Sequence, residues 1–260
     1  MRLVLVCCLI NILTFVPLVQ ARVSPVLYFS FENITGKTVK DDSGNGNDGE
    51  IMGAKQTDGK EGKGLELAAG DNVEIESSDS LHPDLFQRNF TLAMWINPTR
   101  SGDEWQQLWR SRHIDNHTTL FINNNGTLSW RGDVGESWTV LCEAPDADPP
   151  AGQWTHVAVT SDMKKFRLYV NAEQKQDGDW QKMDGENDTY YLGWGTASAS
   201  ERYAGKYDEV VLFPEFLSKD DINILMAQGV KRFSAVTSSG KLTITWGMLK
   251  NGKRNNWKGI

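Results

Sequence analysis

The chain has 260 residues, of which 39% are hydrophobic, 10% aromatic and 23% charged, and these ordinary values exclude a chain that is disordered, collagen-like or coiled-coil throughout. Ten Trp and 24 Gly favour β structure with many turns. The net charge of −7 argues against nucleic acid as a partner. Residues 231–260 hold seven Lys and Arg but no Asp or Glu, which predicts a basic tail on an acidic body.

The N-terminal segment has the pattern of a secretory signal peptide. Arg2 gives a positive start, residues 3–19 are almost wholly apolar, and small residues precede a cleavage point after Ala21. A membrane anchor is the alternative, but an apolar run of this length is marginal for a span, and no later segment is long enough. We therefore expect export, a signal peptide over residues 1–21, one domain over 22–230, and a partly flexible tail over 231–260.

Short apolar or alternating runs recur along the rest of the chain and predict about a dozen strands. Residues 90–96 are apolar at nearly every position, which is typical of a strand buried on both faces. Asn125 and Gly126 form a strong hairpin signal between two such runs. Many short strands at close spacing predict a sandwich or a barrel. In chain order, the main expected strands cover residues 26–31, 65–67, 73–75, 90–96, 107–112, 119–122, 127–131, 154–160, 166–170, 190–194 and 206–213.

One short helix is expected after the last strand. Ser218 can cap its N-terminus, and Asp221 stands three residues later in the position of a capping box. Ile222 and Leu225 begin an apolar stripe, and Gly229 is expected to end the helix. We expect this helix to lie on the surface and to carry no chemistry.

Four blocks of sequence stand out in their order along the chain: residues 26–32 (VLYFSFE), 41–49 (DDSGNGNDG), 154–160 (WTHVAVT) with 168–171 (LYVN), and 207–210 (YDEV). In this order the blocks resemble the LamG-like jelly-roll domain of the concanavalin A-like lectin/glucanase superfamily, close to the laminin G and pentraxin modules. The resemblance covers about residues 25–230. One departure is Ala172, where the family usually has glycine after the asparagine of a hairpin, and this leaves the turn type open.

The resemblance implies an all-β fold of two stacked antiparallel sheets, with the first and last strands adjacent. Members of the superfamily often hold a structural Ca²⁺ where the two ends of the chain meet, which would place Glu32 and Asp208 as ligands here. Asp42 and Asn47 are secondary candidates, because their loop is rich in oxygen donors. Two alternatives stay open, since such loops also form by capping their own backbone, and Lys206 could neutralise the carboxylates instead.

A ligand surface is expected among the tryptophans of the middle of the chain. Flat aromatic faces stack on sugar rings, and polar side chains fix the hydroxyl groups. Each tryptophan could equally pack between the sheets, and the alternation of a strand places Trp130 and Arg131 on opposite faces. The candidate ligand-binding residues are Trp105, Trp109, Arg112, Trp130 and Trp138.

No catalytic residues are expected. The glucanases of the superfamily use a Glu-x-Asp-x-x-Glu strand, and the nearest string here, Glu74-Ile75-Glu76, lacks the middle Asp and the final Glu. His113 and His117 are four residues apart, but in strand and loop sequence this spacing does not give the shared helical face that a zinc site would use.

Five Asn-x-Thr sequons are present, which matters only if the chain enters a compartment that glycosylates. The 17 Asn and 34 Ser or Thr of the chain predict about two by chance. The sequons begin at Asn33, Asn89, Asn116, Asn125 and Asn187.

These observations predict an exported, non-catalytic binding module that recognises carbohydrate or serves in adhesion, with calcium as a structural cofactor. An extracellular protein–protein interaction module is the alternative, and a glycoside hydrolase is the less favoured one. A glycan or an extracellular protein is therefore the expected partner.

Overall fold

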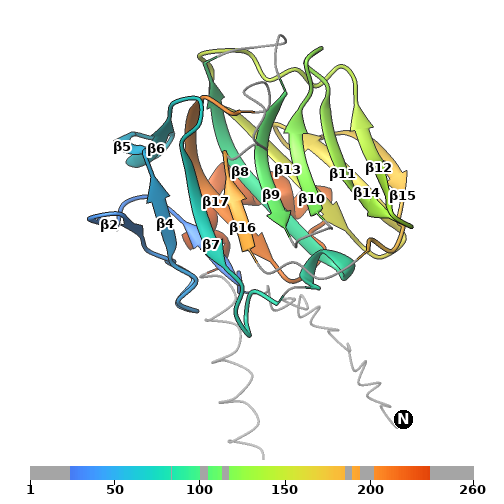
Figure 1. Ribbon diagram of the computed structural model, residues 1–260, viewed down its shortest axis with the longest axis horizontal. Helices are drawn as coiled ribbons and strands as arrows, with labels where there is room; N and C mark the ends of the chain where they lie inside the picture. Colours follow the sequence, from blue (N-terminus) through green and yellow to red (C-terminus); the bar gives the residue numbers. More distant parts are fainter. Residues whose placement is uncertain are drawn as a thin grey trace, which may run out of the picture.

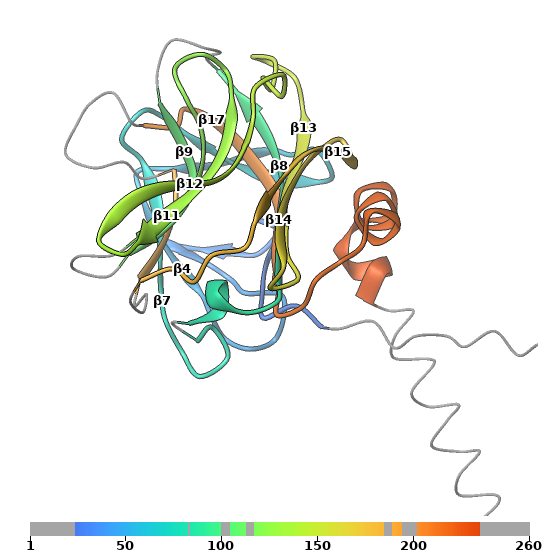
Figure 2. The same cartoon turned by 90° about the vertical axis from the view of Figure 1, so that its right-hand side faces the viewer.

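The computed structural model describes residues 24–82, 84–99, 105–112, 117–184, 189–193 and 202–234. These residues form two antiparallel sheets stacked as a sandwich, with a helix on the outside of one sheet (Figures 1 and 2). The predicted signal peptide and residues 235–260 of the basic tail lie outside the described residues. Within the described ranges, no helix has both the length and the apolar character needed to cross a membrane.

The first sheet has eight strands in the described part of the chain, and we call it the helix-side sheet because the helix packs on its outer face. Its order is β15 (Glu173–Asp179), β14 (Lys165–Val170), β13 (Thr155–Ser161), β8 (Phe90–Pro98), β17 (Gly205–Phe213), β6 (Lys63–Leu67) and β5 (Lys55–Asp58), with β1 (Leu27–Phe29) also paired to β17.

The second sheet, which faces the viewer in Figure 1, has nine strands in the described residues. We call it the front sheet. Its order is β12 (Ser137–Ala144), β11 (Leu128–Val134), β10 (His117–Ile122), β9 (Gln106–Arg112), β16 (Thr189–Leu192), β7 (Asn72–Glu76), β4 (Gly49–Met52), β3 (Thr38–Val39) and β2 (Ile34–Thr35).

The first and last strands lie side by side, as the resemblance implies. Leu27 of β1 lies opposite Leu212 of β17, and Phe29 lies opposite Val210. The N–H of Val26 extends the ladder by donating to the carbonyl oxygen of Leu212 at 2.8 Å. Pairing the ends of the chain in this way satisfies backbone groups that would otherwise form an open sheet edge. The predicted jelly-roll sandwich is therefore confirmed.

The space between the sheets is filled by aliphatic and aromatic side chains. Phe86, in the short 3-10 helix η1 (Leu85–Gln87), lies at the centre of an aromatic cluster. Its ring centroid is 4.9 Å from Phe90, 5.5 Å from Trp130 and 6.0 Å from Tyr190. All four side chains are fully buried. Offset and edge-to-face ring contacts of this kind add to the free energy gained from burying the ring area.

Strand β8 is buried on both faces, as its continuous apolar sequence predicts. Phe90, Leu92, Met94 and Ile96 point between the sheets, whereas Ala93 points outward and packs under the helix. A strand at the middle of a covered sheet has no solvated face, so its sequence shows no polar alternation.

The helix covers residues 219–234, and its predicted start is confirmed. The N–H of Asp221 donates to Ser218 Oγ at 3.3 Å, and the N–H of Ser218 donates to Asp221 Oδ2 at 3.2 Å, which is a reciprocal capping box. The predicted break at Gly229 is present, since Gly229 adopts φ 75°, but helical residues continue beyond it to residue 234. The N–H of Val230 donates to Glu209 Oε2 at 3.3 Å. The helix therefore crosses the predicted domain boundary at residue 230.

The hairpin between β14 and β15 shows which turn type forms at Ala172. Asn171 and Ala172 have φ values of 49° and 61°, and Val170 pairs with Glu173. Two positive φ values in a two-residue loop define a type I′ turn. Such turns usually contain glycine, because the Cβ atom of alanine is sterically disfavoured at positive φ. The chain therefore forms this tight turn with alanine at a position where glycine is better suited.

Candidate functional site

The outer face of β10, β11 and β12 on the front sheet carries the candidate site. Leu120 and Trp130 belong to the core between the sheets, so strand alternation places Phe121 and Arg131 on the outer face. Gly132 faces inward, because a side chain there would meet Met183 and Leu141 of the core, and Asp133 therefore faces outward. We call this surface the β10–β12 face (Figure 1).

Aromatic and charged side chains are stacked at the centre of the β10–β12 face. The rings of Trp105 and Phe121 are 5.1 Å apart and nearly parallel, with an interplanar angle of 28°. The guanidinium of Arg131 lies 5.5 Å from the Trp105 centroid and 5.2 Å from the Phe121 centroid. Its Nη2 also pairs with Glu143 Oε1 at 3.2 Å. The aromatic rings and the ion pair hold the arginine in one orientation, which is what a recognition site requires.

The outer strand of this face adds two exposed apolar side chains. Trp138 lies opposite Asp133, and Val140 lies opposite Arg131. Their exposed fractions are 41% and 42%, which puts them among the few large hydrophobic residues at the surface. An exposed indole ring beside polar groups is suited to a ligand that has both apolar and polar faces.

The predicted ligand residues divide between this face and the core. Trp105 and Trp138 belong to the β10–β12 face, together with Phe121, Val140 and Glu143, which the sequence reasoning did not single out. Trp109 and Trp130 are fully buried between the sheets, so the prediction that they form part of a ligand surface is wrong. Arg112 ends strand β9, but its side chain is not among those described.

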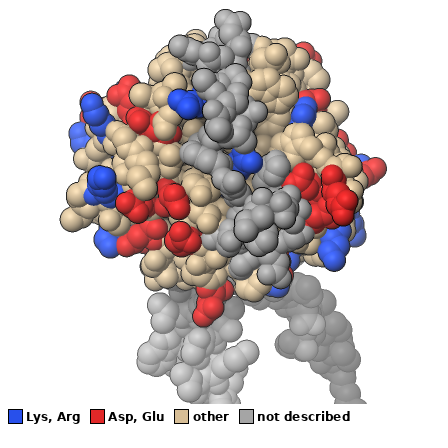
Figure 3. All heavy atoms as spheres, viewed as in Figure 1, with Lys and Arg blue, Asp and Glu red and all other residues tan. Residues whose placement is uncertain are grey.

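Three glutamates form an acidic stripe on the same sheet, away from the aromatic part. Glu50 of β4 lies opposite Glu74 of β7, and Glu76 is two residues further along β7. Figure 3 shows acidic side chains gathered over β4 and β7 on the left of the view. Partial burial raises the pKa of Glu74, and repulsion from Glu76 and Glu50 adds to this rise. The stripe disfavours an anionic ligand on this part of the sheet.

The two predicted principal calcium ligands contact one loop, Glu32 from the connection between β1 and β2, and Asp208 from β17. Glu32 Oε1 accepts the N–H of Lys63 at 2.7 Å, and Asp208 Oδ2 accepts the N–H of Glu61 at 2.8 Å. The Asp208 carboxyl is buried, and burial raises its pKa to about 7. No Lys or Arg pairs with it in the described residues, Lys206 included. A buried carboxylate without a cationic partner fits the chemistry of a calcium site.

A cleft of about 330 Å³ lies between the loop and the end of the helix. Charged side chains of both signs line it: Glu32, Glu61 and Glu209, and Lys231 and Arg232 from the helix. The hydroxyl of Tyr28 donates to Glu209 Oε1 at 2.5 Å, and burial raises the pKa of Glu209. Glu209 has φ 50° at the irregularity between Asp208 and Val211. Within the described ranges, however, no three or more His, Cys, Asp or Glu are grouped so as to hold a metal ion.

The polar side chains of the loop at residues 41–49 are hydrogen-bonded within the loop and to neighbouring segments. Asp41 Oδ1 accepts the N–H groups of Tyr28 and Ser43 at 3.0 and 2.9 Å. The side chain of Asn47 donates to the carbonyl oxygen of Val26 at 2.7 Å and accepts from the Ser78 hydroxyl at 2.6 Å. Asp42 accepts from Ser30 and Asn33. The backbone-capping alternative therefore accounts for this loop, while a calcium role for Asp42 and Asn47 stays a prediction.

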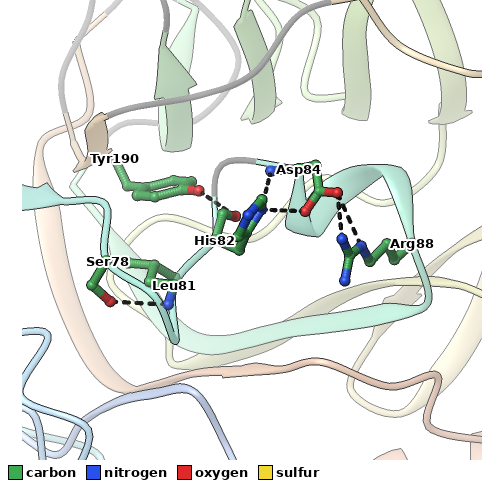
Figure 4. A network of polar contacts seen from close by, with 6 residues as sticks. All are labelled: Ser78, Leu81, His82, Asp84, Arg88 and Tyr190. Atoms are coloured by element: carbon green, nitrogen blue, oxygen red, sulfur yellow. Dashed lines mark hydrogen bonds and ion pairs between the residues drawn. The ribbon is translucent and has the colours of Figure 1, made fainter.

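A polar network at residues 78–88 contains a serine, a histidine and an aspartate (Figure 4). His82 Nδ1 lies 2.5 Å from Asp84 Oδ1, and Arg88 Nη2 lies 2.5 Å from Asp84 Oδ2. The Ser78 hydroxyl does not contact His82; it accepts the N–H of Leu81 at 3.0 Å and donates to Asn47. This geometry orders the segment but does not pair a nucleophile with a base.

The paired ends and stacked antiparallel sheets define a jelly-roll sandwich. Residues 67–223 match the family model Laminin_G_3, described as the concanavalin A-like lectin/glucanases superfamily, and since this is more than half of the chain, the chain belongs to that superfamily. A search of curated proteins finds no match.

Solved structures with this fold include binding domains of toxins and one domain of an extracellular arabinanase. The receptor-binding domain of botulinum neurotoxin C/D mosaic serotype superposes with a TM-score of 0.65 at 18% identity, over 79% of this chain and 51% of that one. The binding domain of botulinum neurotoxin DC in complex with rat synaptotagmin II gives 0.62 at 15% identity, over 78% and 51%. The chain thus spans about half the length of these toxin domains.

A third structure matches along nearly its whole length. Domain 4 of AbnA, a GH43 extracellular arabinanase from Geobacillus stearothermophilus, in complex with arabinotriose, superposes with a TM-score of 0.63 at 20% identity, over 78% of this chain and 98% of that domain. At such identities these likenesses show the fold alone.

Proposed function

We propose that this chain is an exported, non-catalytic module that binds carbohydrate on the β10–β12 face. The observation that carries the proposal is the convergence of Trp105, Arg131 and Trp138 on one outer sheet face. The apolar face of a sugar ring can lie on an indole, while the Arg131–Glu143 pair supplies hydrogen-bond donors and acceptors to its hydroxyl groups. The likeness to an arabinanase domain bound to arabinotriose supports this ligand class.

The test is a glycan array followed by calorimetric titration of any sugar that binds. We expect Trp138→Ala to weaken binding about tenfold or more, because a stacking contact is lost. Met163→Ala is a matched control, since Met163 is also an exposed large side chain but lies in the turn between β13 and β14 of the helix-side sheet. Equal loss in both variants, or binding unaffected by Trp138→Ala, would place the site elsewhere.

An extracellular protein partner is the second candidate function. The exposed pair Trp138 and Val140 on the outermost strand of the front sheet favours it, because adjacent exposed apolar side chains commonly mark protein interfaces. The likeness to a toxin binding domain in complex with synaptotagmin II supports this class. This alternative would be favoured if the chain binds no sugar on the array but binds a protein partner, and if Trp138→Ala abolishes binding to that partner.

We also propose a structural calcium ion beside Glu32 and Asp208. Calcium bound there would neutralise the buried Asp208 carboxylate, and the two side chains are oxygen donors that it prefers. We expect Ca²⁺ to raise the melting temperature relative to EDTA, and Asp208→Asn to abolish this rise. Asp220→Asn, at an exposed site on the helix, is the control. An identical melting temperature of the unmodified chain in Ca²⁺ and in EDTA would refute the proposal.

A further inference from the structure

We infer that this chain carries N-linked glycans at Asn33, Asn89 and Asn125. The inference rests on the proposed export, because these glycans are added only in a secretory compartment. Each asparagine begins an Asn-x-Thr sequon without proline in the middle, and the sequence holds five sequons where composition predicts about two. The other two, at Asn116 and Asn187, lie outside the described residues.

All three asparagines are exposed and lie in connections between elements. Asn33 falls between β1 and β2, Asn89 between η1 and β8, and Asn125 between β10 and β11. None lies within a strand, so a bulky glycan would displace neither the core nor a sheet ladder. Connections are also the segments that tolerate added bulk best. Surface position and sequon thus coincide at every one of the three described sites.

Asn33 can carry a glycan and keep its local contact. Its Nδ2 donates to Asp42 Oδ1 at 2.9 Å. Glycosylation replaces one of the two amide hydrogens and leaves the other free to donate. The sequon threonine, Thr35, is exposed. Thr35→Ala therefore removes the sequon without touching the Asn33 contact, and Thr35→Ser keeps the sequon as a matched control.

Asn89 is presented at the end of an ordered segment. The polar network of Figure 4 fixes this segment, since Arg88 binds Asp84 and the Tyr190 hydroxyl donates to the carbonyl oxygen of His82 at 3.1 Å. The side chain of Asn89 itself has no hydrogen-bond partner among the described residues. The sequon threonine is buried, and its hydroxyl accepts the N–H of Leu217 at 2.9 Å. Asn89→Gln is therefore the clean variant here, and changing Thr91 is not.

Asn125 stands in the hairpin turn that its sequence predicts. Its Oδ1 accepts the N–H of Thr127 at 3.1 Å, while Gly126 takes φ 85°. The amide nitrogen, which a glycan would occupy, takes no part in this contact. Asn125→Asp keeps the oxygen acceptor and removes the glycan attachment point. It therefore separates the effect of the glycan from the effect of the turn.

The experiment expresses the full chain in a eukaryotic secretory host, once with its own leader and once with a heterologous signal peptide. Total cell protein and medium are both digested and mapped by mass spectrometry before and after peptide-N-glycosidase treatment. We expect glycopeptides at all three asparagines. Thr35→Ala, Asn89→Gln and Asn125→Asp should each lower the glycosylated mass by one glycan, and Thr35→Ser should not.

The outcomes separate this inference from the proposed export. Secreted chain with unmodified Asn33, Asn89 and Asn125 would overturn the glycan sites and leave export standing. Glycopeptides found with the heterologous signal peptide, but none with the native leader, would support the glycan sites and refute export by the native leader. Mapping total cell protein ensures that retention inside the cell does not hide the result.

Discussion

The outer faces of the two sheets differ in side-chain size and in what lies on them. On the helix-side sheet, Val211, Ala93 and Ala158 form a row across β17, β8 and β13, with the two alanines paired directly. The helix packs over this row with Ile222 and Leu225 (Figure 2). On the front sheet, the β10–β12 face presents Trp105, Phe121, Arg131 and Trp138 instead. Small side chains let a helix approach closely, whereas large aromatic side chains with charged partners are suited to a ligand.

The largest expected effect concerns a tryptophan that faces the core. Trp130 is fully buried, with its ring centroid 5.5 Å from both Phe86 and Phe90. Trp130→Ala should lower the free energy of unfolding by about 3–5 kcal/mol, because it leaves a cavity among aromatic rings. Urea denaturation measures this loss. A loss below about 1 kcal/mol would mean that Trp130 is not a core residue.

The covered face should lose stability when the helix loses its anchor. Ile222 is fully buried against the helix-side sheet. Ile222→Ala should cost about 2–4 kcal/mol in urea denaturation, through lost burial and the cavity left behind. The neighbouring Asn223 is exposed, so Asn223→Ala should stay within about 0.5 kcal/mol of the unmodified chain. Similar values for both variants would show that the helix does not stabilise this face.

The covered face should also respond to acid through His156. His156 is buried in β13 opposite Trp95, and burial lowers its pKa to about 4. Since the unfolded chain binds this proton near pH 6.5 and the folded chain does not, stability should fall by about 3 kcal/mol as the pH drops from about 6.5 to about 4. His156→Gln should remove this part of the slope in denaturation measured across that range. An unchanged slope would contradict the burial of a neutral imidazole.

The smallest effect on stability is expected on the β10–β12 face. Trp138 is exposed at the surface, in contrast to Trp130. Trp138→Ala should change the free energy of unfolding by less than about 0.5 kcal/mol, while it weakens ligand binding. A loss of several kcal/mol in the same denaturation experiment would instead make Trp138 part of the fold, and the comparison between the two faces would fail.

The sequence predicts the core strands well because their apolar residues stand at the positions that the fold buries. It misses β15, whose residues are almost all exposed and polar, because an edge strand of this kind has no apolar alternation to reveal it. The small strands β2 and β3 are too short to give a period. The helical residues after Gly229 are also not predicted, and there the N–H of Val230 donates to Glu209, which is distant in sequence.

The candidate site could be predicted only in part because irregular strands break the alternation rule. Leu108 and Trp109 both face the core, next to a register shift between Leu120 and Phe121. A second shift lies between Trp130 and Arg131. Such bulges decide which face a tryptophan takes, and no residue type in these segments marks them. The sequence therefore locates the aromatic region but does not assign each tryptophan to a face.

The pairing of β1 with β17 also determines how the sandwich resists unfolding under mechanical force. Leu27, where β1 begins, lies opposite Leu212, near the point where β17 ends. Tension that separates residue 26 from residue 213 therefore loads the ladder at one end, and its hydrogen bonds open one after another, as in a zipper. A sandwich whose terminal strands slid past each other would have to break all of those bonds at once, so this arrangement yields at a lower force.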